Sequence, residues 1–249
     1  MPADRRPVAD TVVLVPTYNE SASLPRLLAR IAAAAPEVDV LVIDDASPDG
    51  TADLAERLAD ADPRISVLRR SGKEGLGRAY RAGYAVALER GYRLVVQMDA
   101  DGSHPPETLP EMLALASASP AADLVIGSRW VAGGRTVDWS AGRERLSRLA
   151  NGYARRILRL AVADLTAGYR VYRAEALRRL DLAAVRSHGY YFQVEMTVRV
   201  VEAGGVVVEV PIVFAERDAG VSKMTFGIIL EAMVKVTALG VRRWLRRSS

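Results

Sequence analysis

The feature that most constrains the fold is a regular series of short apolar runs, separated by stretches with helical spacing. The runs are rich in β-branched residues and begin at Thr11, Val38, Ile65, Arg93 and Ala122. Continuous runs of this length suit strands that are covered on both faces. The segments with helical spacing between them are 23–35, 51–61, 76–90 and 107–118. This alternation predicts an α/β fold with a mostly parallel central sheet flanked by helices.

The composition supports a full hydrophobic core and excludes thiol chemistry. The chain has 249 residues, half of them apolar, and no cysteine. Disulfides and thiolate metal sites are therefore absent, and two histidines are too few for an ordinary zinc cluster. We expect any bound metal to be a hard cation with oxygen ligands. The first residues, "MPADRRPVADTVVLVP", contain no apolar stretch before a cleavage site, so we expect no signal peptide and a cytoplasmic protein.

Positive charge is concentrated in one part of the chain. The net charge is only +4, yet the segment 135–179 carries eleven arginines against four acidic residues. Four further arginines lie within 242–247. Such a segment attracts anions, and by charge alone nucleic acid, nucleotide phosphates and anionic lipid all remain candidate partners.

Polar motifs follow four of the predicted strands. They are "PTYNE" from Pro16, "DDASPDGT" from Asp44, "DADGSHPPE" from Asp99 and "GSRWVAGG" from Gly127. Ligands of open α/β sheets bind beyond the carboxyl ends of the strands, near the point where strand order reverses. We therefore expect three acidic or polar loops and one arginine loop to face a common cleft.

The pair Asp99 and Asp101 is the strongest chemical signal. Two carboxylates one residue apart repel each other unless a positive charge lies between them. A turn can bring both around a divalent cation, whose open positions substrate phosphates then fill. For Asp44 and Asp45, turn and cap chemistry competes with binding of a nucleoside by at least one carboxylate. For Arg129, a place at the rim of the cleft favours phosphate binding over a solvated surface role.

Five motifs in order across nearly the whole chain resemble a known family. "VPTYNE", "VIDDASPDGT", "MDADGSHPPE", "GSRW" and "GVSKM" are similar to motifs of the dolichol- or polyprenol-phosphate mannosyltransferases of glycosyltransferase family 2. The resemblance implies one GT-A catalytic domain over 1–249, with GDP-mannose as donor, Mg²⁺ or Mn²⁺ as cofactor and a polyprenyl phosphate as acceptor. It further implies a nucleotide-sugar-binding half at 1–128, an acceptor-binding half at 129–223 and an amphipathic membrane-interface helix at 224–249.

The same resemblance assigns roles to individual residues. It implies that the nucleoside is held by Pro16, Tyr18, Glu20, Ile43 and Asp45, that the metal and diphosphate meet Asp99, Ala100 and Asp101, that Arg129, Arg217 and Lys223 contact phosphates, and that Arg129, Arg143 and Ser147 receive the lipid phosphate. By this resemblance Asp99, Asp101, Arg129 and Lys223 are the candidate catalytic residues. Many relatives carry a glutamine as a further metal ligand where this chain has Ser103, which can still ligate directly or through water.

The chemistry of such a transfer needs no dedicated base. A phosphate acceptor is already anionic at neutral pH, so the problem is to bring two anions together without repulsion. A metal and the cations Arg129, Arg143, Arg217 and Lys223 would neutralise the charges. In-line displacement would then convert an α-linked donor into a β-mannosyl phospholipid.

A lipid acceptor requires contact with a membrane, and the segment from Met224 is the best candidate for it. Its apolar run is interrupted by Glu231 and Lys235, which share one helical stripe with Arg242 and Arg246. This pattern favours a helix on the membrane surface over one that spans it. The arginine-rich stretch from Arg143 predicts a second surface helix. We expect a peripheral protein on the cytoplasmic face, or one that uses a separate membrane-anchoring protein, although both helices fit packing on the protein itself.

Three other functions compete. A family 2 transferase that uses UDP-glucose or another donor with the same acceptor differs only in pocket details. A nucleic-acid-binding protein would use the arginine-rich region and give Asp99 and Asp101 no role; we expect no nucleic-acid partner. A dinucleotide oxidoreductase is disfavoured because no Gly-x-Gly-x-x-Gly follows the first strand.

Overall fold

The structure of the protein is a computed structural model that describes residues 9–118, 122–185, 187, 189–216 and 226–247. The strands are β1 (Thr11–Thr17), β2 (Asp39–Asp44), β3 (Ile65–Arg69), β4 (Leu94–Gln97), β5 (Leu124–Ser128), β6 (Arg135–Thr136), β7 (Arg170–Arg173), β8 (Val207–Pro211) and β9 (Val213–Phe214). The helices are α1 (Leu24–Ala34), α2 (Thr51–Ala61), α3 (Leu76–Glu89), α4 (Leu109–Ser117), α5 (Ala141–Leu158), α6 (Ala174–Arg178), α7 (Gly189–Glu202) and α8 (Phe226–Arg247), with short 3₁₀ turns at Pro106–Thr108 and Leu182–Ala184.

Seven strands form one central sheet of order β3-β2-β1-β4-β7-β5-β8, with β6 and β9 as a separate pair. Strands β1, β2, β3 and β4 are mutually parallel, and β8 is parallel to β5. Strand β7 is antiparallel to both of its neighbours, β4 and β5. The five predicted strands and the four predicted helices between them are confirmed, and so is the mostly parallel sheet.

Both faces of the sheet are covered, as the β-branched runs predict. One core cluster joins side chains of β1, β2 and β4 to helices α1 and α4. The other joins the opposite sides of the same strands to α3 and α7, and it extends outward to α5 and α8. Because side chains alternate between faces, Val12 and Leu14 belong to one cluster while Val13 and Val15 belong to the other. The sheet continues beyond residue 128 through β7 and β8, so both proposed halves share it; their functional division stays a prediction.

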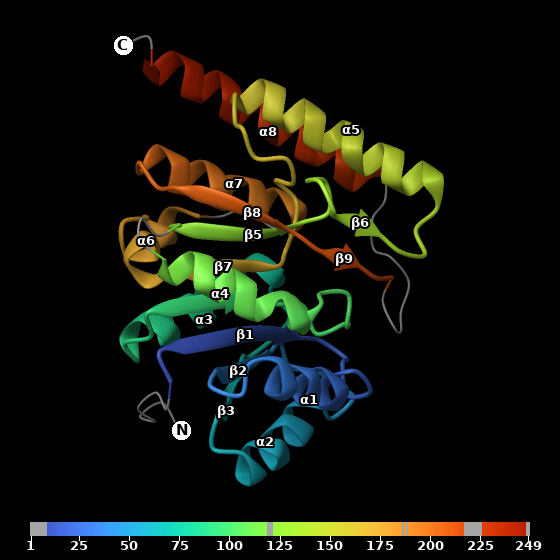
Figure 1. Cartoon of the computed structure of the whole chain (residues 1–249), viewed down its shortest axis with the longest axis vertical. Coiled ribbons are helices and arrows are strands. Elements are labelled where there is room, and N and C mark those ends of the chain that lie inside the picture. The colour runs from blue at the N-terminus through green and yellow to red at the C-terminus, as the bar shows by residue number, and fades with distance from the viewer. Residues whose placement is uncertain (1–8, 119–121, 186, 188, 217–225, 248–249) are drawn as a thin grey trace.

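Helices α5 and α8 lie side by side beyond α7, at one end of the molecule (Figure 1). They approach closely at Gly240, where a Cβ atom would lie only 2.5 Å from Cγ2 of Ile157. The hydroxyls of Tyr153 and Thr237 are 2.6 Å apart across the same interface. The two helices predicted at the membrane surface are therefore present, and each packs one side on the protein. No helix in the described part of the chain is long and apolar enough to cross a bilayer.

Candidate active site

The motifs that follow the strands meet at one cavity of about 410 Å³ beyond the carboxyl ends of β1, β2 and β4. Its lining includes ten of the predicted site residues: Pro16, Tyr18, Glu20, Asp45, Asp99, Ala100, Asp101, Ser103, Arg129 and Arg143. A second hollow, between α7 and α8, contains none of them. The expected common cleft is thus formed, and the acidic and arginine loops face it together.

Asp99 stands between two groups that fix its position. Its Oδ1 accepts a hydrogen bond from the Tyr80 hydroxyl at 3.0 Å, and its backbone N–H donates to His104 Nδ1 at 3.0 Å. Burial, together with the Asp99 charge, raises the pKa of Tyr80 well above its usual value, so the phenol keeps its proton and remains a donor. Because Nδ1 accepts, the neutral imidazole of His104 carries its proton on Nε2.

Asp101 is held by its own turn. Its Oδ1 accepts from the backbone N–H of Ser103 at 3.1 Å and from the Ser103 hydroxyl at 2.6 Å. Both residues are buried at the wall of the cavity. Ser103 therefore orients Asp101 in this arrangement.

The residues at this end fit a hard divalent cation. Asp99 and Asp101 supply carboxylate oxygens, and the space beside them is kept open by Gly168. A Cβ atom at Gly168 would lie 3.5 Å from Asp99 Oδ2 and 3.6 Å from His104 Nε2. The described residues contain no cluster of three or more histidines, cysteines or acids suited to a metal. A cation here would accordingly take its remaining ligands from water and substrate phosphates.

The two neighbouring acids after β2 have different surroundings. Asp44 is buried and accepts hydrogen bonds from the Thr17 hydroxyl at 2.9 Å and from the backbone N–H of Ser47 at 2.8 Å. Asp45 lines the cavity, forms an ion pair with Arg70 and accepts from the Glu74 backbone N–H at 3.3 Å. Asp44 therefore holds the turn, and Asp45 is the acid placed to meet a ligand.

A network around Asp49 joins the loop after β1 to the start of α2. The Glu20 backbone N–H donates to Thr51 Oγ1 at 3.0 Å, and the Thr51 hydroxyl donates to Asp49 Oδ1 at 2.5 Å. The Ser21 backbone N–H donates to Asp49 Oδ2 at 3.1 Å. Burial alone would raise the pKa of Asp49, but the hydrogen bonds from Thr51 and Ser21 outweigh it and lower the pKa to about 2. This network holds the backbone of Glu20 and Ser21. Tyr18, two residues before Glu20, has the Lys73 ammonium 3.7 Å from the centroid of its ring.

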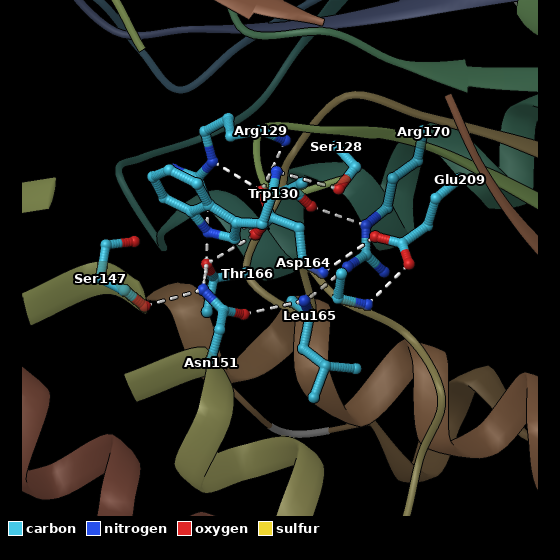
Figure 2. A network of polar contacts seen from close by, with 12 residues as sticks. Ser128, Arg129, Trp130, Ser147, Asn151, Asp164, Leu165, Thr166, Arg170 and Glu209 are labelled. Carbon is cyan, nitrogen blue, oxygen red and sulfur yellow. Dashed lines mark hydrogen bonds and ion pairs between the residues drawn. The ribbon is translucent and has the colours of Figure 1, made fainter. Parts of the chain in front are cut away.

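Arg129 is bound more tightly than its predicted phosphate role suggests. Its Nε and Nη2 donate to the two carboxylate oxygens of Asp164, each at 2.7 Å, and Nη2 also donates to Thr166 Oγ1 at 2.8 Å (Figure 2). Asp164 is fully buried. Although burial raises the pKa of Asp164, the Arg129 guanidinium more than compensates and holds that pKa below its usual value. The charge of Arg129 is thus already matched by a carboxylate within the wall of the cavity.

The same network reaches helix α5 through Asn151. The side-chain amide of Asn151 donates to Thr166 Oγ1 at 3.1 Å and accepts from the Leu165 backbone N–H at 2.9 Å (Figure 2). It also donates to the backbone carbonyl of Ser147 at 3.0 Å. Ser147 itself is buried and does not line the cavity.

Arg143 lies in the first turn of α5 and lines the cavity. Ser140 caps this helix by accepting from the Arg143 backbone N–H at 3.3 Å. The guanidinium forms an ion pair with Glu216 and lies 3.9 Å from the Trp139 ring. Of the other predicted residues, Ile43 is fully buried in the core and not at the cavity, whereas Arg217 and Lys223 lie outside the described residues.

Several lining residues were missed by sequence reasoning, among them His104, Gln193 and Thr166. His104 falls inside the "DADGSHPPE" motif, so its place could have been suspected. Gln193 and Asp164 carried no local signal, since each lies in an ordinary amphipathic or turn context far from the motifs.

The comparisons with known proteins agree with this geometry. The family model described as glycosyl transferase family 2 matches residues 12–181. The chain belongs to glycosyl transferase family 2. It is 51% identical over 248 residues to a polyprenol monophosphomannose synthase of Mycolicibacterium smegmatis, covering 99% of this chain and 93% of the relative. It is 53% identical over 234 residues to an undecaprenyl-phosphate mannosyltransferase of Micrococcus luteus, covering 94% and 95%.

The chain also resembles solved structures of glycosyltransferases with the GT-A fold. A mannosyltransferase from Pyrobaculum calidifontis in complex with GDP-Man and Mn²⁺ aligns with a TM-score of 0.62 at 18% identity, over 98% of this chain and 66% of that one. A glucosyl-3-phosphoglycerate synthase from Mycobacterium tuberculosis in complex with Mn²⁺ and UDP-glucose aligns with a TM-score of 0.67 at 19% identity, over 95% and 79%. The predicted GT-A fold is therefore confirmed, and the chain is a glycosyltransferase. Membership of family 2 leaves the nucleic-acid and oxidoreductase alternatives without support.

Proposed function

We propose that this family 2 glycosyltransferase transfers mannose from GDP-mannose to a polyprenyl monophosphate, with inversion, to give a β-mannosyl phosphoryl polyprenol. The observation that carries the proposal is the identity of 51% and 53%, over nearly full length, to two enzymes named for mannosylation of a polyprenol phosphate. The cavity supports it, because carboxylates suited to a metal and an arginine near its opening lie in one space.

Three parts of the cavity would have different tasks. Tyr18, Glu20 and Asp45 would hold the nucleoside, as the hydroxyl and N–H groups of a nucleoside suit carboxylate acceptors. Asp99 and Asp101 would hold Mg²⁺ or Mn²⁺, which neutralises charge on the departing diphosphate when bound. Arg143, with Arg217 and Lys223 from outside the described residues, would draw in the lipid phosphate. Ser147 would act through its place in α5, since it is buried behind the lining.

The side chains of the protein would accelerate the transfer mainly by orienting the donor and the acceptor. A phosphate monoester brings its own nucleophilic oxygen, and no general base is assigned. The Tyr80 and His104 contacts fix Asp99, and the Ser103 contacts fix Asp101, so the donor would be bound in one pose. Arg143 would hold the acceptor oxygen in line with the breaking bond.

We propose that the enzyme works at a membrane surface, on its cytoplasmic face. Large apolar side chains are exposed on α5 and α8: Leu146, Leu149, Val234, Val241, Trp244 and Leu245. Arginines accompany them on both helices, a combination typical of interfacial helices. A separate anchoring protein is compatible with the same surface.

The test is transfer of label from radiolabelled GDP-mannose to polyprenyl phosphate in Mg²⁺ or Mn²⁺, with Asp101→Asn as the comparison. We expect metal-dependent label in the lipid fraction for the wild type and at least a hundredfold less for the variant, as for loss of one strong electrostatic group. Exposed Asp10→Asn serves as the control and keeps full activity. Label from UDP-glucose alone would move the assignment to a glucosyltransferase, and no label from either donor would refute it.

A further inference from the structure

Gln193 is a buried side chain whose amide makes no hydrogen bond to any residue that the structure describes. It lies on α7, is 2% exposed and lines the candidate active-site cavity. Within the described part of the chain, neither Nε2 nor Oε1 of its amide has a hydrogen-bond partner. A buried amide without partners destabilises the fold, so such a residue calls for a reason.

The backbone carbonyl of Gln193 accepts two hydrogen bonds, so the side-chain amide is the group that still needs an explanation. The Gln193 carbonyl accepts from Arg170 Nη1 at 2.9 Å and from the Thr197 hydroxyl at 3.0 Å. Arg170 is itself completely buried. These bonds fix this part of α7 against the sheet. They place the Gln193 side chain at the cavity but do not involve its amide group.

The chemistry of the amide identifies its partner. The carboxylates of the cavity suit a cation, and its arginines suit phosphate, whereas an amide offers two N–H donors and a carbonyl acceptor. Sugar hydroxyls, which both donate and accept, match that set. We propose that Gln193 is a specificity-determining residue that hydrogen-bonds the hydroxyls of the transferred sugar. This inference rests on the proposed function, because it takes a nucleotide sugar to be the donor.

Reaching the sugar requires a change of rotamer. Both amide atoms are covered, and the three side-chain torsions of glutamine let the amide swing while the helix stays fixed. Pairing with the sugar hydroxyls would remove the free-energy cost of the unpaired amide. Because the free nucleotide lacks the sugar, the protein would bind the nucleotide sugar more tightly than the free nucleotide.

Gln97 provides a matched control. It is a glutamine on β4 that is also fully buried with both amide atoms unpaired, yet it does not line the cavity. If an unpaired amide were only a fault in packing, Gln97 and Gln193 would respond alike to substitution. A ligand-binding role for Gln193 predicts that only its substitution changes the affinity for a ligand of the cavity.

The experiment compares Gln193→Met and Gln97→Met with the wild type, using calorimetric titration with GDP and with GDP-mannose in Mn²⁺. Methionine keeps the volume and removes the unpaired amide, so we expect an unchanged or higher Tm for both variants. For Gln193→Met we expect the Kd of GDP-mannose to rise about tenfold while the Kd of GDP stays unchanged. Gln97→Met should bind both ligands like the wild type.

Each other outcome has a definite meaning. An equal rise of both Kd values for Gln193→Met would place its contact on the nucleoside and refute the inference. Unchanged values for both ligands would show that the amide meets only water, which also refutes it. A wild-type protein that binds neither GDP nor GDP-mannose would instead refute the proposed function on which the inference rests.

Discussion

At the scale of single residues, the role of a side chain depends more on the residues it contacts than on its place in a sequence motif. Arg129 lies where a phosphate-binding arginine was predicted, but its guanidinium is paired with Asp164 inside the wall of the cavity. Sequence reasoning found Arg129 through its place after β5. It could not find Asp164, because the partner is 35 residues away and only the folded chain brings the two together.

Asp164→Asn should be strongly destabilising. The change leaves the buried Arg129 cation without its counter-charge, which typically costs about 3–5 kcal/mol. Urea unfolding should measure this loss, and the double variant Arg129→Met with Asp164→Leu should recover most of it. Asp10→Asn, which removes an exposed ion pair with Arg93, should change stability by less than about 1 kcal/mol. Equal effects of Asp164→Asn and Asp10→Asn would contradict the account.

Asp49 predicts a specific dependence on acid. Its pKa in the folded protein is about 2, below the ordinary value of 3.8. A depressed pKa contributes stability that is present above the unfolded pKa and disappears as pH falls through the folded one. The difference in Tm between wild type and Asp49→Asn should therefore be largest at pH 5 and above, and should shrink between about pH 4 and pH 2. If the difference in Tm between wild type and Asp49→Asn did not vary with pH, the lowered pKa of Asp49 would be contradicted.

At the scale of elements, the sequence predicts what local pattern determines. The runs that became β1, β2, β4 and β5 are mostly apolar, so both their type and their burial could be predicted directly. The run of β3 contains Ser66 and Arg69, and that strand is only partly buried. Strand β7 was missed because "RVYR" is four residues long and arginines frame it. Its first residue, Arg170, is fully buried, and its guanidinium donates hydrogen bonds to the carbonyls of Ala167, Leu165 and Gln193. Because one of these partners lies far away in the sequence, no local pattern predicts that this arginine is buried.

The exposed faces of α5 and α8 predict membrane binding. Leu149 is 71% exposed and Trp244 is 57% exposed, each on one of the two helices. The variant Leu149→Glu with Trp244→Glu should bind vesicles of phosphatidylglycerol and phosphatidylethanolamine at least tenfold more weakly, as measured by co-sedimentation, because two buried apolar groups are lost. Val206→Glu alters an apolar residue before β8 that is 52% exposed, and this variant should bind like the wild type. Unimpaired binding by the double variant would exclude these helices as the membrane contact.

At the scale of the whole molecule, the sheet explains why a linear sequence predicted so much of the site. The motifs were found separately, and the parallel arrangement of β1, β2 and β4 brings their following loops to one edge. Apart from His104, which lies within the motif after β4, the missed residues Gln193 and Thr166 come from α7 and from the segment before β7, which reach the cavity through packing between elements. No spacing rule in the sequence predicts that approach.

Ligand binding should stabilise the entire fold. Since GDP and Mn²⁺ would bind loops from several strands at once, saturating both should raise the free energy of unfolding by about 2.7 kcal/mol at a hundred times Kd. A rise in Tm of several degrees is expected for a chain of this size. Asp101→Asn should lose the part of the shift that depends on Mn²⁺ and keep the part due to GDP alone. Identical shifts with and without Mn²⁺ in the wild type would rule out the metal site.

The ion pair between Arg143 and Glu216 has a consequence for turnover. Both residues line the cavity, so the guanidinium proposed to receive the acceptor phosphate already has a carboxylate beside it. If Arg143 receives that phosphate as proposed, the phosphate would displace Glu216, and its net gain in electrostatic energy would be the difference between two similar pairings. Such an exchange would favour dianions over monoanions, and it would let the less charged phosphodiester depart as the carboxylate returns.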